Sequence, residues 1–278
     1  MNCYADLHIH TTNSDGLLTP DECIDKAVKA NVKVISFTDH DSVEAYKHVS
    51  HINREISIIS GVEITVTDRL HILGYFINLE NSILQKELEK MRIRKAKWLF
   101  NLVDYYGPKF GISLNKILSK YGNITMGSIC SSLIEATNGK LDKKDIYNQY
   151  FWNKEGKNVL GKIPSFTEQE AINLIKTAEG IAVLAHPALV WENNKNFEEI
   201  LAQLIANGLD GMEIFHILNE RRDKIPYLIK LAESKNLIIT GGSDFHGNKN
   251  KNTYIGEYGL DKDLYKRFEK TKKDNWEV

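Results

Sequence analysis

The segment Asp6-Leu7-His8-Ile9-His10 lies close to the start of the chain, within an apolar run from Tyr4 to His10 that predicts a β-strand. Successive side chains of a strand point to opposite faces, so His8 and His10 share one face while Leu7 and Ile9 share the other. Two imidazoles on one strand face have the spacing of metal ligands. Taken alone, such a pair is explained equally well by two polar histidines at a strand end.

Short apolar runs of the same kind recur along the chain, each followed by a turn and then by a helical pattern. Continuous apolar runs suit strands that are buried on both faces of a parallel sheet. Together with the first run they number seven, which predicts an α/β fold in the form of a closed or nearly closed βα barrel. The further runs are Lys33–Thr38, Ser57–Val62, His71–Tyr75, Ile181–Ala185, Gly211–Ile214 and Leu237–Thr240.

The predicted helices carry recognisable start signals. Thr19-Pro20-Asp21-Glu22 offers a threonine N-cap, a proline at the first helical position and a capping-box glutamate. Ser165-Phe166-Thr167-Glu168 precedes a predicted helix from Gln169 to Thr177 in a similar way.

The alternation of strands and helices stops between Leu79 and Lys162, where several helices are expected. A connection of this length needs structure of its own. Residues 1–78 and 163–278 are therefore expected to form the barrel, and residues 79–162 a small helical insertion that caps it.

The composition is that of an ordinary globular protein, with 278 residues of which 42% are hydrophobic and 26% charged. Lys plus Arg number 36 and Asp plus Glu 37, so the net charge does not attract nucleic acid or an anionic membrane. Cys3, Cys23 and Cys130 form no CxxC pair, and an odd thiol argues against a disulfide scaffold. No signal-peptide region and no apolar run of roughly 18 residues is present. We expect a cytoplasmic protein without a membrane partner.

Acidic residues and histidines recur at or just beyond the C-terminal ends of the predicted strands. In a βα barrel these ends converge on one face, where active sites are found. Nine oxygen and imidazole ligands suit two or three divalent metal ions, with Mn, Zn or Fe as candidates. Burial of so many without metal would carry a large desolvation cost. The candidates beyond His8 and His10 are Asp15, His40, Glu63, His71, His186, Asp244 and His246.

Five motifs join these residues into one pattern, in which the sequence resembles the PHP (polymerase and histidinol phosphatase) superfamily over nearly the whole chain. The motifs are Asp6-Leu7-His8-Ile9-His10 followed by Asp15-Gly16, Thr38-Asp39-His40-Asp41, Gly61-Val62-Glu63, Ala185-His186-Pro187 and Gly242-Ser243-Asp244-Phe245-His246-Gly247. The resemblance implies a distorted seven-stranded βα barrel with a trinuclear metal centre. The branch that it resembles most carries a helical insertion after the fourth strand. That branch includes phosphatases of 3′,5′-bisphosphate nucleotides that also trim RNA from its 5′ end.

The resemblance further implies which residues share each metal ion. The first metal would take His8, His10, Glu63 and Asp244, the second Glu63, His71 and His186, and the third Asp15, His40 and His246. Glu63 would bridge two ions, which needs a carboxylate because imidazole cannot offer two oxygens. The expected catalytic residues are Glu63, Asp15, His40 and His246.

The implied reaction is hydrolysis of a phosphate monoester, with a nucleotide bisphosphate or an RNA 5′ end as the expected substrate. Metal cations would neutralise the phosphate oxygens, and a metal-bridging water of lowered pKa would become the attacking hydroxide. The leaving alkoxide needs a proton or a metal, and Asp39, Asp41 and ordered water are open alternatives. No obligate protein partner is evident from the sequence.

Candidate substrate contacts lie in the basic run Arg92-Ile93-Arg94-Lys95-Ala96-Lys97 and after the sixth strand. A basic run on a helix is commonly a solvated face, whereas guanidinium groups also bind phosphate bidentately. Arg92 and Arg94 are two apart on a helix, so at most one of them is expected to face the site. His216 is the third candidate. Asp6 is expected to support a ligand as a hydrogen-bond acceptor rather than bind metal itself.

Relatives in this branch usually carry Gly-Arg-Pro-His in the insertion, whereas this chain has Gly127-Ser128-Ile129-Cys130. Substrate recognition is therefore the property in which this chain is expected to differ. Two alternatives remain for the function. The first is a histidinol-phosphate phosphatase, although that branch resembles the barrel alone. The second is a metal-binding partner domain without turnover, which the presence of all nine ligands disfavours.

Overall fold

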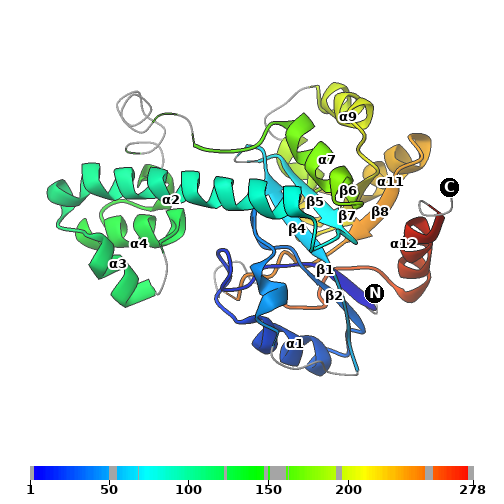
Figure 1. Ribbon diagram of the computed structural model, residues 1–278, viewed down its shortest axis with the longest axis horizontal. Helices are drawn as coiled ribbons and strands as arrows, with labels where there is room; N and C mark the ends of the chain where they lie inside the picture. The colour runs from blue at the N-terminus through cyan, green and yellow to red at the C-terminus, as the bar shows by residue number, and fades with distance from the viewer. Residues whose placement is uncertain are drawn as a thin grey trace. The chain divides into compact units, whose positions relative to one another are not determined.

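The computed structural model describes residues 3–49, 55–67, 69–121, 124–146, 150, 161, 163–191, 196–247 and 253–274. Within these ranges the protein is a mixed α/β fold with one three-stranded and one five-stranded sheet (Figure 1). The chain divides into two compact units, Met1–Leu88 with Ser165–Val278, and Glu89–Pro164. Both sheets belong to the first unit, which is called the sheet unit below, and the second is called the helical unit.

The three-stranded sheet is parallel throughout. In it β1 (Ala5–Ile9) pairs with β2 (Val34–Phe37), and β2 pairs with β3 (Ser57–Ile59). Every residue of β1 is buried, as expected for a strand that is covered on both faces. Leu7 and Ile9 belong to two different apolar clusters, so β1 lies between two parts of the core.

The five-stranded sheet is mixed. Its second strand runs antiparallel to both of its neighbours, and the last three strands are parallel to one another. In order across the sheet, the strands are β4 (Gly61–Thr65), β5 (His71–Tyr75), β6 (Ile181–Leu184), β7 (Gly211–Phe215) and β8 (Ile238–Gly241).

The two sheets differ from the single seven-stranded barrel that the sequence predicts. The run expected as one strand over Ser57–Val62 is divided at Ser60 into β3 and β4, which pair with different neighbours. Ser60 leaves the ladder because its carbonyl accepts from the Phe76 N–H (2.8 Å) and its hydroxyl donates to the Ile77 carbonyl (2.7 Å). The sheets then meet through isolated bridges, His40 with Glu63 and Ile9 with Phe245, rather than through a continuous ladder.

The Tyr46 hydroxyl occupies the seam between β2 and β4. Its oxygen lies 2.7 Å from the Phe37 carbonyl oxygen and 3.0 Å from that of Ile59, and it accepts from the Gly61 N–H at 2.6 Å. Gly61 approaches β2 so closely that a Cβ there would lie 2.3 Å from the Ser36 Oγ. The phenol therefore replaces ladder hydrogen bonds that the divided strand has lost.

Helices of the sheet unit begin with the expected signals. Thr19 caps α1 (Pro20–Lys29) through the expected capping box with Glu22. Thr167 caps α7 (Glu168–Thr177), which begins one residue earlier than expected and whose box partner is Glu170. The other helical segments of this unit are η1 (Glu44–Lys47), α8 (Pro187–Trp191), α9 (Phe197–Ala206), α10 (Ile217–Arg221), α11 (Ile225–Ser234) and α12 (Lys262–Asp274).

The helical unit has a core of its own. Leu102, Ile117 and Leu133, from three different helices, are buried together in one apolar cluster. None of the helices within the described ranges is both long enough and apolar enough to cross a membrane. A capping role for this unit stays a prediction. Within the described residues its helices are α2 (Ser82–Phe110), which begins in the sheet unit, α3 (Leu114–Tyr121), α4 (Met126–Ala136) and α5 (Lys143–Ile146).

The substitution Tyr46→Phe should destabilise the fold by about 1 to 3 kcal/mol, because the Gly61 N–H loses its acceptor at the seam. Urea unfolding of the variant and the parent protein measures this difference in free energy. Tyr254→Phe is the matched control, since the Tyr254 side chain is 70% exposed. Equal losses in the two variants would show that the seam does not depend on the hydroxyl.

Candidate metal centre

Strand β1 delivers the first two histidines of the cluster. His8 and His10 are fully buried, and their Nε2 atoms are 3.1 Å apart. The rings converge because alternate residues of a strand share one face. The sequence prediction that these two side chains point to a common place is thus matched by the geometry.

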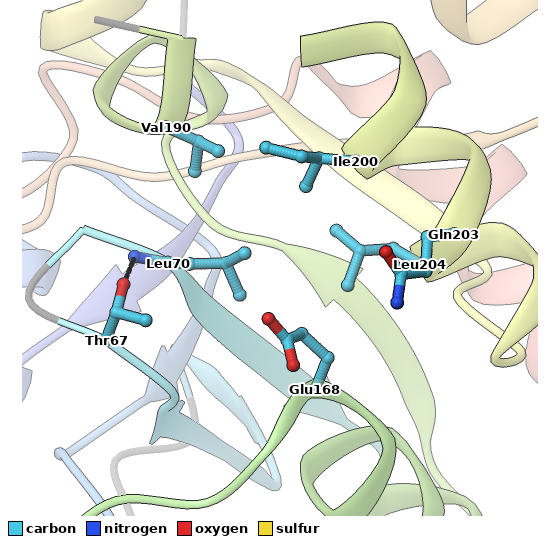
Figure 2. Close-up of a pocket in the computed structure, with 7 residues that line it drawn as sticks. All are labelled: Thr67, Leu70, Glu168, Val190, Ile200, Gln203 and Leu204. Carbon is cyan, nitrogen blue, oxygen red and sulfur yellow. Dashed lines mark hydrogen bonds between the residues drawn. The ribbon is translucent and has the colours of Figure 1, made fainter. Parts of the chain in front are cut away.

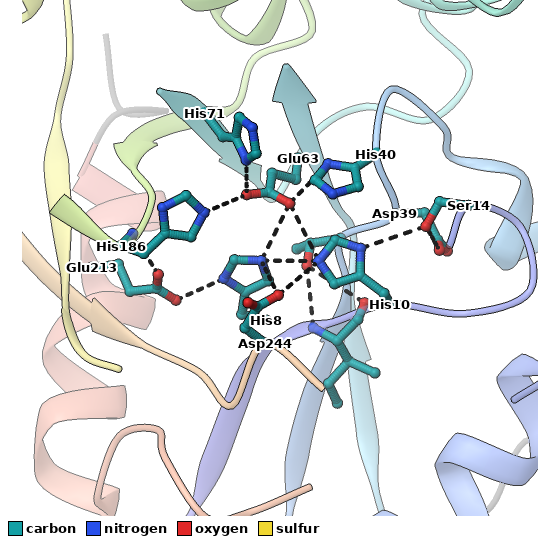
Figure 3. A network of polar contacts seen from close by, with 12 residues as sticks. His8, His10, Ser14, Asp39, His40, Glu63, His71, His186, Glu213 and Asp244 are labelled. Carbon is teal, nitrogen blue, oxygen red and sulfur yellow. Dashed lines mark hydrogen bonds and ion pairs between the residues drawn. The ribbon is translucent and has the colours of Figure 1, made fainter. Parts of the chain in front are cut away.

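Glu63, at the centre of β4, is the hub of the cluster (Figure 3). Its side chain is 1% exposed, and its two oxygens face different histidines. Oε1 lies 2.9 Å from His71 Nδ1 and 3.1 Å from His186 Nε2. Oε2 lies 3.0 Å from His40 Nδ1, 3.3 Å from His10 Nε2 and 3.4 Å from His8 Nε2.

Asp15, Asp244 and His246 extend the cluster beyond the ends of β1 and β8. The Asp15 Oδ1 lies 3.2 Å from His246 Nε2 and 3.6 Å from His10 Nδ1. The Asp244 Oδ1 lies 3.2 Å from His10 Nε2 and 3.3 Å from His246 Nδ1. His40 also approaches this side, with its Nε2 4.0 Å from Asp15 Oδ1.

All nine residues that the sequence predicts as ligands therefore lie in one connected network. Four overlapping groups within the described residues place three or more ligand atoms within 4.8 Å of one another. The groups are His10, Asp15, His40 and His246; His8, His10 and Glu63; His40, Glu63 and His71; and His8, Glu213 and His216. The binding of metal by these residues stays a prediction.

The donor atoms fit divalent metal ions. Imidazole nitrogens and carboxylate oxygens are the ligands that Zn, Mn and Fe accept. The Nδ1 atom of His186 and the Nε2 atom of His216 are buried without a hydrogen-bond partner among the described residues. A buried polar cluster with unsatisfied atoms is costly unless a further group completes it.

Opposite charges stabilise the cluster in the absence of a cation. Burial alone would raise the pKa of Glu63, but the surrounding histidines hold it well below its ordinary value. Burial alone would lower the pKa of His8, but the carboxylates of Glu213 and Glu63 raise it well above its ordinary value. The pKa of His10 is raised to about 9 in the same way, although burial opposes the shift.

Two further aspartates hold the segments that carry Asp15 and Asp244. Asp39 accepts from the Thr11 N–H (2.7 Å) and the Ser14 hydroxyl (2.6 Å), which positions the loop before Asp15. Asp6 accepts from the Ser243 N–H (2.9 Å) and the Gly256 N–H (2.8 Å). Burial raises the pKa of Asp6 to about 6. The Asp6 Oδ1 also accepts from the His8 N–H (3.4 Å), so this carboxylate supports predicted ligands through the main chain, in line with the acceptor role expected from the sequence.

Asp39 and Asp41, two of the alternatives for the group that protonates the leaving alkoxide, already accept hydrogen bonds. The Asp41 Oδ1 accepts from the Thr65 N–H (2.9 Å), and Asp39 bonds the loop described above. Both carboxylates are therefore occupied with main-chain or hydroxyl hydrogen bonds in this structure.

Glu213, in β7, belongs to the cluster although the sequence analysis did not select it. It is fully buried, and its Oε1 lies 2.9 Å from His8 Nδ1. The sequence signal that could have identified Glu213 is the presence of an acid within the apolar run Gly211–Ile214, which is expected to form a buried strand. His216 follows β7 and is also fully buried, with its Nε2 3.7 Å from Asp244 Oδ2.

A cavity of about 160 Å³ is lined by other residues (Figure 2). None of the nine predicted ligands lines it, and Glu168 is its one charged lining residue. It touches the cluster through Thr67, whose carbonyl oxygen lies 3.1 Å from His71 Nε2. The lining residues are Thr67, Leu70, Glu168, Val190, Ile200, Gln203 and Leu204.

Arg92 and Arg94 lie on α2 in the helical unit. Both are exposed, and the guanidinium of Arg92 is paired with Glu89 (Nε to Oε2, 2.6 Å). Their role in substrate binding stays a prediction.

An α/β fold that gathers buried histidines and carboxylates at its strand ends is typical of metal-dependent hydrolases. The model of the PHP domain family matches residues 6–237, and the chain belongs to this family.

Similarity to named proteins supports the assignment to the PHP domain family. The chain is 28% identical over 254 residues to the 5′-3′ exoribonuclease Rnm of Escherichia coli, covering 87% of this chain and 84% of that protein. It is 26% identical over 252 residues to the 3′,5′-nucleoside bisphosphate phosphatase of Chromobacterium violaceum, covering 87% of this chain and 86% of that protein. It is similar to the structure of a candidate metal-dependent phosphoesterase from Bifidobacterium adolescentis. That match has a TM-score of 0.78 and 26% identity, covering 95% and 94% of the two chains.

Metal affinity should fall as the pH is lowered through about 9, because the His10 ring must lose a proton before it can bind a cation. Calorimetric zinc titrations in buffers of different ionisation enthalpy measure the protons released. We expect net proton release per protein at neutral pH. Binding without proton release between about pH 6 and 9 would contradict the raised pKa.

Proposed function

We propose that the protein is a metal-dependent phosphoesterase that hydrolyses a phosphate monoester, with a nucleotide bisphosphate or the 5′ end of an RNA as substrate. The observation that carries the proposal is the buried Glu63 carboxylate, whose two oxygens face different histidines. The relatives named as an exoribonuclease and as a nucleoside bisphosphate phosphatase support the substrate class.

The proposed centre holds two or three divalent ions, with Mn, Zn or Fe as candidates. The contacts of Glu63 support its role as the residue shared by two ions, since each oxygen has its own histidines. The proposed ligand sets are His8, His10, Glu63 and Asp244; Glu63, His71 and His186; and Asp15, His40 and His246.

Divalent ions in these positions would neutralise phosphate oxygens and lower the pKa of a water molecule, which supplies the nucleophile. The protein supplies fixed geometry. Asp39 restrains the loop that carries Asp15, and Asp6 restrains the segment that carries Asp244. Pre-organised ligands of this kind cost little reorganisation during the reaction.

His216 is proposed to donate a hydrogen bond to a phosphate oxygen of the substrate. Its Nδ1 accepts from the Leu218 N–H at 3.1 Å, so a neutral ring carries its proton on Nε2. That Nε2–H is buried and has no hydrogen-bond partner among the described residues. A protonated Nε2 cannot bind metal, which supports a substrate contact rather than a further ligand.

One of Arg92 and Arg94 is proposed to bind a second phosphate group. Ser128 stands where relatives of this branch usually carry arginine, and it caps α4 together with Thr125. The Ser128 N–H donates to Thr125 Oγ1 (3.0 Å), and the Thr125 N–H donates to Ser128 Oγ (2.8 Å). Phosphate recognition therefore needs cations from elsewhere, and the exposed guanidinium groups of α2 offer them.

A cytoplasmic location is part of the same proposal. Cys3, Cys23 and Cys130 are free thiols, which supports a reducing compartment.

The substitution Glu63→Gln should lower turnover by about 10³-fold or more, since it removes the charge that two ions share, and such a loss is about 4 kcal/mol of transition-state stabilisation. The assay is phosphate release from a 3′,5′-bisphosphate nucleotide, with metal content measured by elemental analysis. His216→Ala is expected to lose far less. Near-normal turnover of Glu63→Gln with intact metal would refute the shared-ligand role.

Arg92→Ala or Arg94→Ala should raise KM for a bisphosphate nucleotide by roughly ten- to 150-fold, the value of one charge-assisted hydrogen bond. Only one of the two variants should respond, because residues two apart point to different sides of a helix. The kcat should stay unchanged, since the contact binds ground state and transition state equally. Saturation curves on the corresponding monophosphate are the control, and an unchanged KM on both substrates in both variants would make the run a solvated helix face.

A further inference from the structure

Glu213 contacts two members of the histidine cluster, one with each carboxylate oxygen (Figure 3). Oε1 lies 2.9 Å from the Nδ1 of His8, which is 205 residues away in sequence. Oε2 accepts from the backbone N–H of His186 at 2.8 Å, 27 residues away. Glu213 is fully buried, so water does not compete for these contacts.

The contact with His8 selects one tautomer of the ring. A carboxylate oxygen only accepts hydrogen bonds, and a neutral imidazole has one N–H and one lone pair. In the neutral form of the ring, which is the form that binds metal, the proton must therefore be on Nδ1 and the lone pair on Nε2. The Nε2 atom is the one that faces the cluster, 3.4 Å from Glu63 Oε2 and 3.6 Å from Asp244 Oδ1.

The contact with His186 acts on the main chain. His186 has φ of 29°, a left-handed conformation that is costly for a residue other than glycine. A hydrogen bond from its N–H to a buried carboxylate offsets part of that cost. The same conformation directs the His186 ring so that its Nε2 lies 3.1 Å from Glu63 Oε1.

We propose that Glu213 is a positioning residue of the metal centre, which keeps the Nε2 of His8 free for a cation and holds His186 in its ligand conformation. The proposal rests on the metal centre of the proposed function. It assigns to one buried acid the alignment of ligands from two different strands. Carboxylates that bond the second nitrogen of a ligand histidine typically change metal affinity by ten- to 100-fold.

A separate ion bound by His8, Glu213 and His216 is the competing explanation, since their ligand atoms lie close enough. Both oxygens of Glu213 already accept hydrogen bonds, from the His8 ring and from the His186 main chain. A cation at this point would have to displace the His8 proton. The geometry therefore favours support of ligands over ligation.

The decisive experiment compares zinc affinity of the full chain and of Glu213→Gln, by competition with a chromophoric chelator. Glutamine has one acceptor oxygen and one NH₂ donor, so it cannot satisfy both contacts. We expect the tightest zinc sites to weaken by about ten- to 100-fold without loss of stoichiometry. Loss of one equivalent of zinc at unchanged affinity of the rest would instead identify Glu213 as a ligand and overturn the proposal.

Two further variants separate positioning from general structural support. Asn219 is also fully buried and also joins β7 to the segment after β6, because it bonds the Ala188 N–H (3.0 Å) and the Glu213 carbonyl (3.0 Å). Its side chain bonds main-chain atoms and, within the described part of the chain, no histidine ring of the cluster, so Asn219→Ala should keep zinc affinity within about twofold. Glu213→Asp keeps the charge but shortens the reach, and it should bind zinc as weakly as Glu213→Gln. Parent-like affinity of Glu213→Asp, or an equal loss in Asn219→Ala, would overturn the proposal.

A measurement on the parent protein tests the proposal even if Glu213→Gln fails to fold. Long-range ¹H–¹⁵N spectra of the zinc-loaded protein, with His8 assigned from a His8→Gln variant, should show the His8 proton on Nδ1. A proton on Nε2 would contradict the proposal directly. These readouts do not use substrate, so they test the role of Glu213 separately from the proposed function. A parent protein that binds zinc but hydrolyses no phosphate monoester would contradict the proposed function and leave the role of Glu213 standing.

Discussion

The buried carboxylate of Glu63 is the interaction on which the rest of the molecule depends. A carboxylate without a partner in the interior carries a desolvation cost that would exceed the stability of an ordinary domain. Five imidazole rings, delivered by β1, by β5 and by the segments after β2 and β6, surround it and supply the compensating charge. The strand ends are thus constrained by electrostatics as well as by apolar packing.

The break between the three-stranded and the five-stranded sheet lies next to this buried carboxylate. The seam between the two sheets runs beside Glu63. Its carbonyl oxygen accepts from the Asp41 N–H (2.9 Å), and its backbone forms an isolated bridge with His40, beyond the end of β2. Main-chain positions near the centre are left-handed at Asp41, His186 and Asp244, a conformation that regular strands exclude. Irregular backbone at these points lets ligands from parallel and antiparallel strands face one another.

The sequence predicted those features that depend on the spacing of neighbouring residues. It did not predict those that depend on contacts between residues far apart in the chain. His8 and His10 converge because a strand has a period of two, and the other predicted ligands join them because they lie at strand ends. Ser60 carries no local sign that it breaks a strand, because the break is made by Tyr46, Phe76 and Ile77. Glu213 was missed for a similar reason, since its partner His8 is 205 residues away and an acid in an apolar run has no spacing rule.

The two units of the chain differ in how strongly their candidate functional residues depend on one another. The nine predicted ligands and Glu213 all belong to the sheet unit, where each contacts other members of the cluster, so a change at one position alters the charge seen by the others. Arg92, Arg94 and Ser128 belong to the helical unit, where Ser128 serves a local capping box and the arginines are exposed. Substitution of the two exposed arginines is expected to change stability by no more than about 0.5 kcal/mol, as is usual at exposed positions. The proposed phosphate contacts of α2 can therefore change at little cost in stability, whereas a change among the coupled charges of the cluster affects several residues at once.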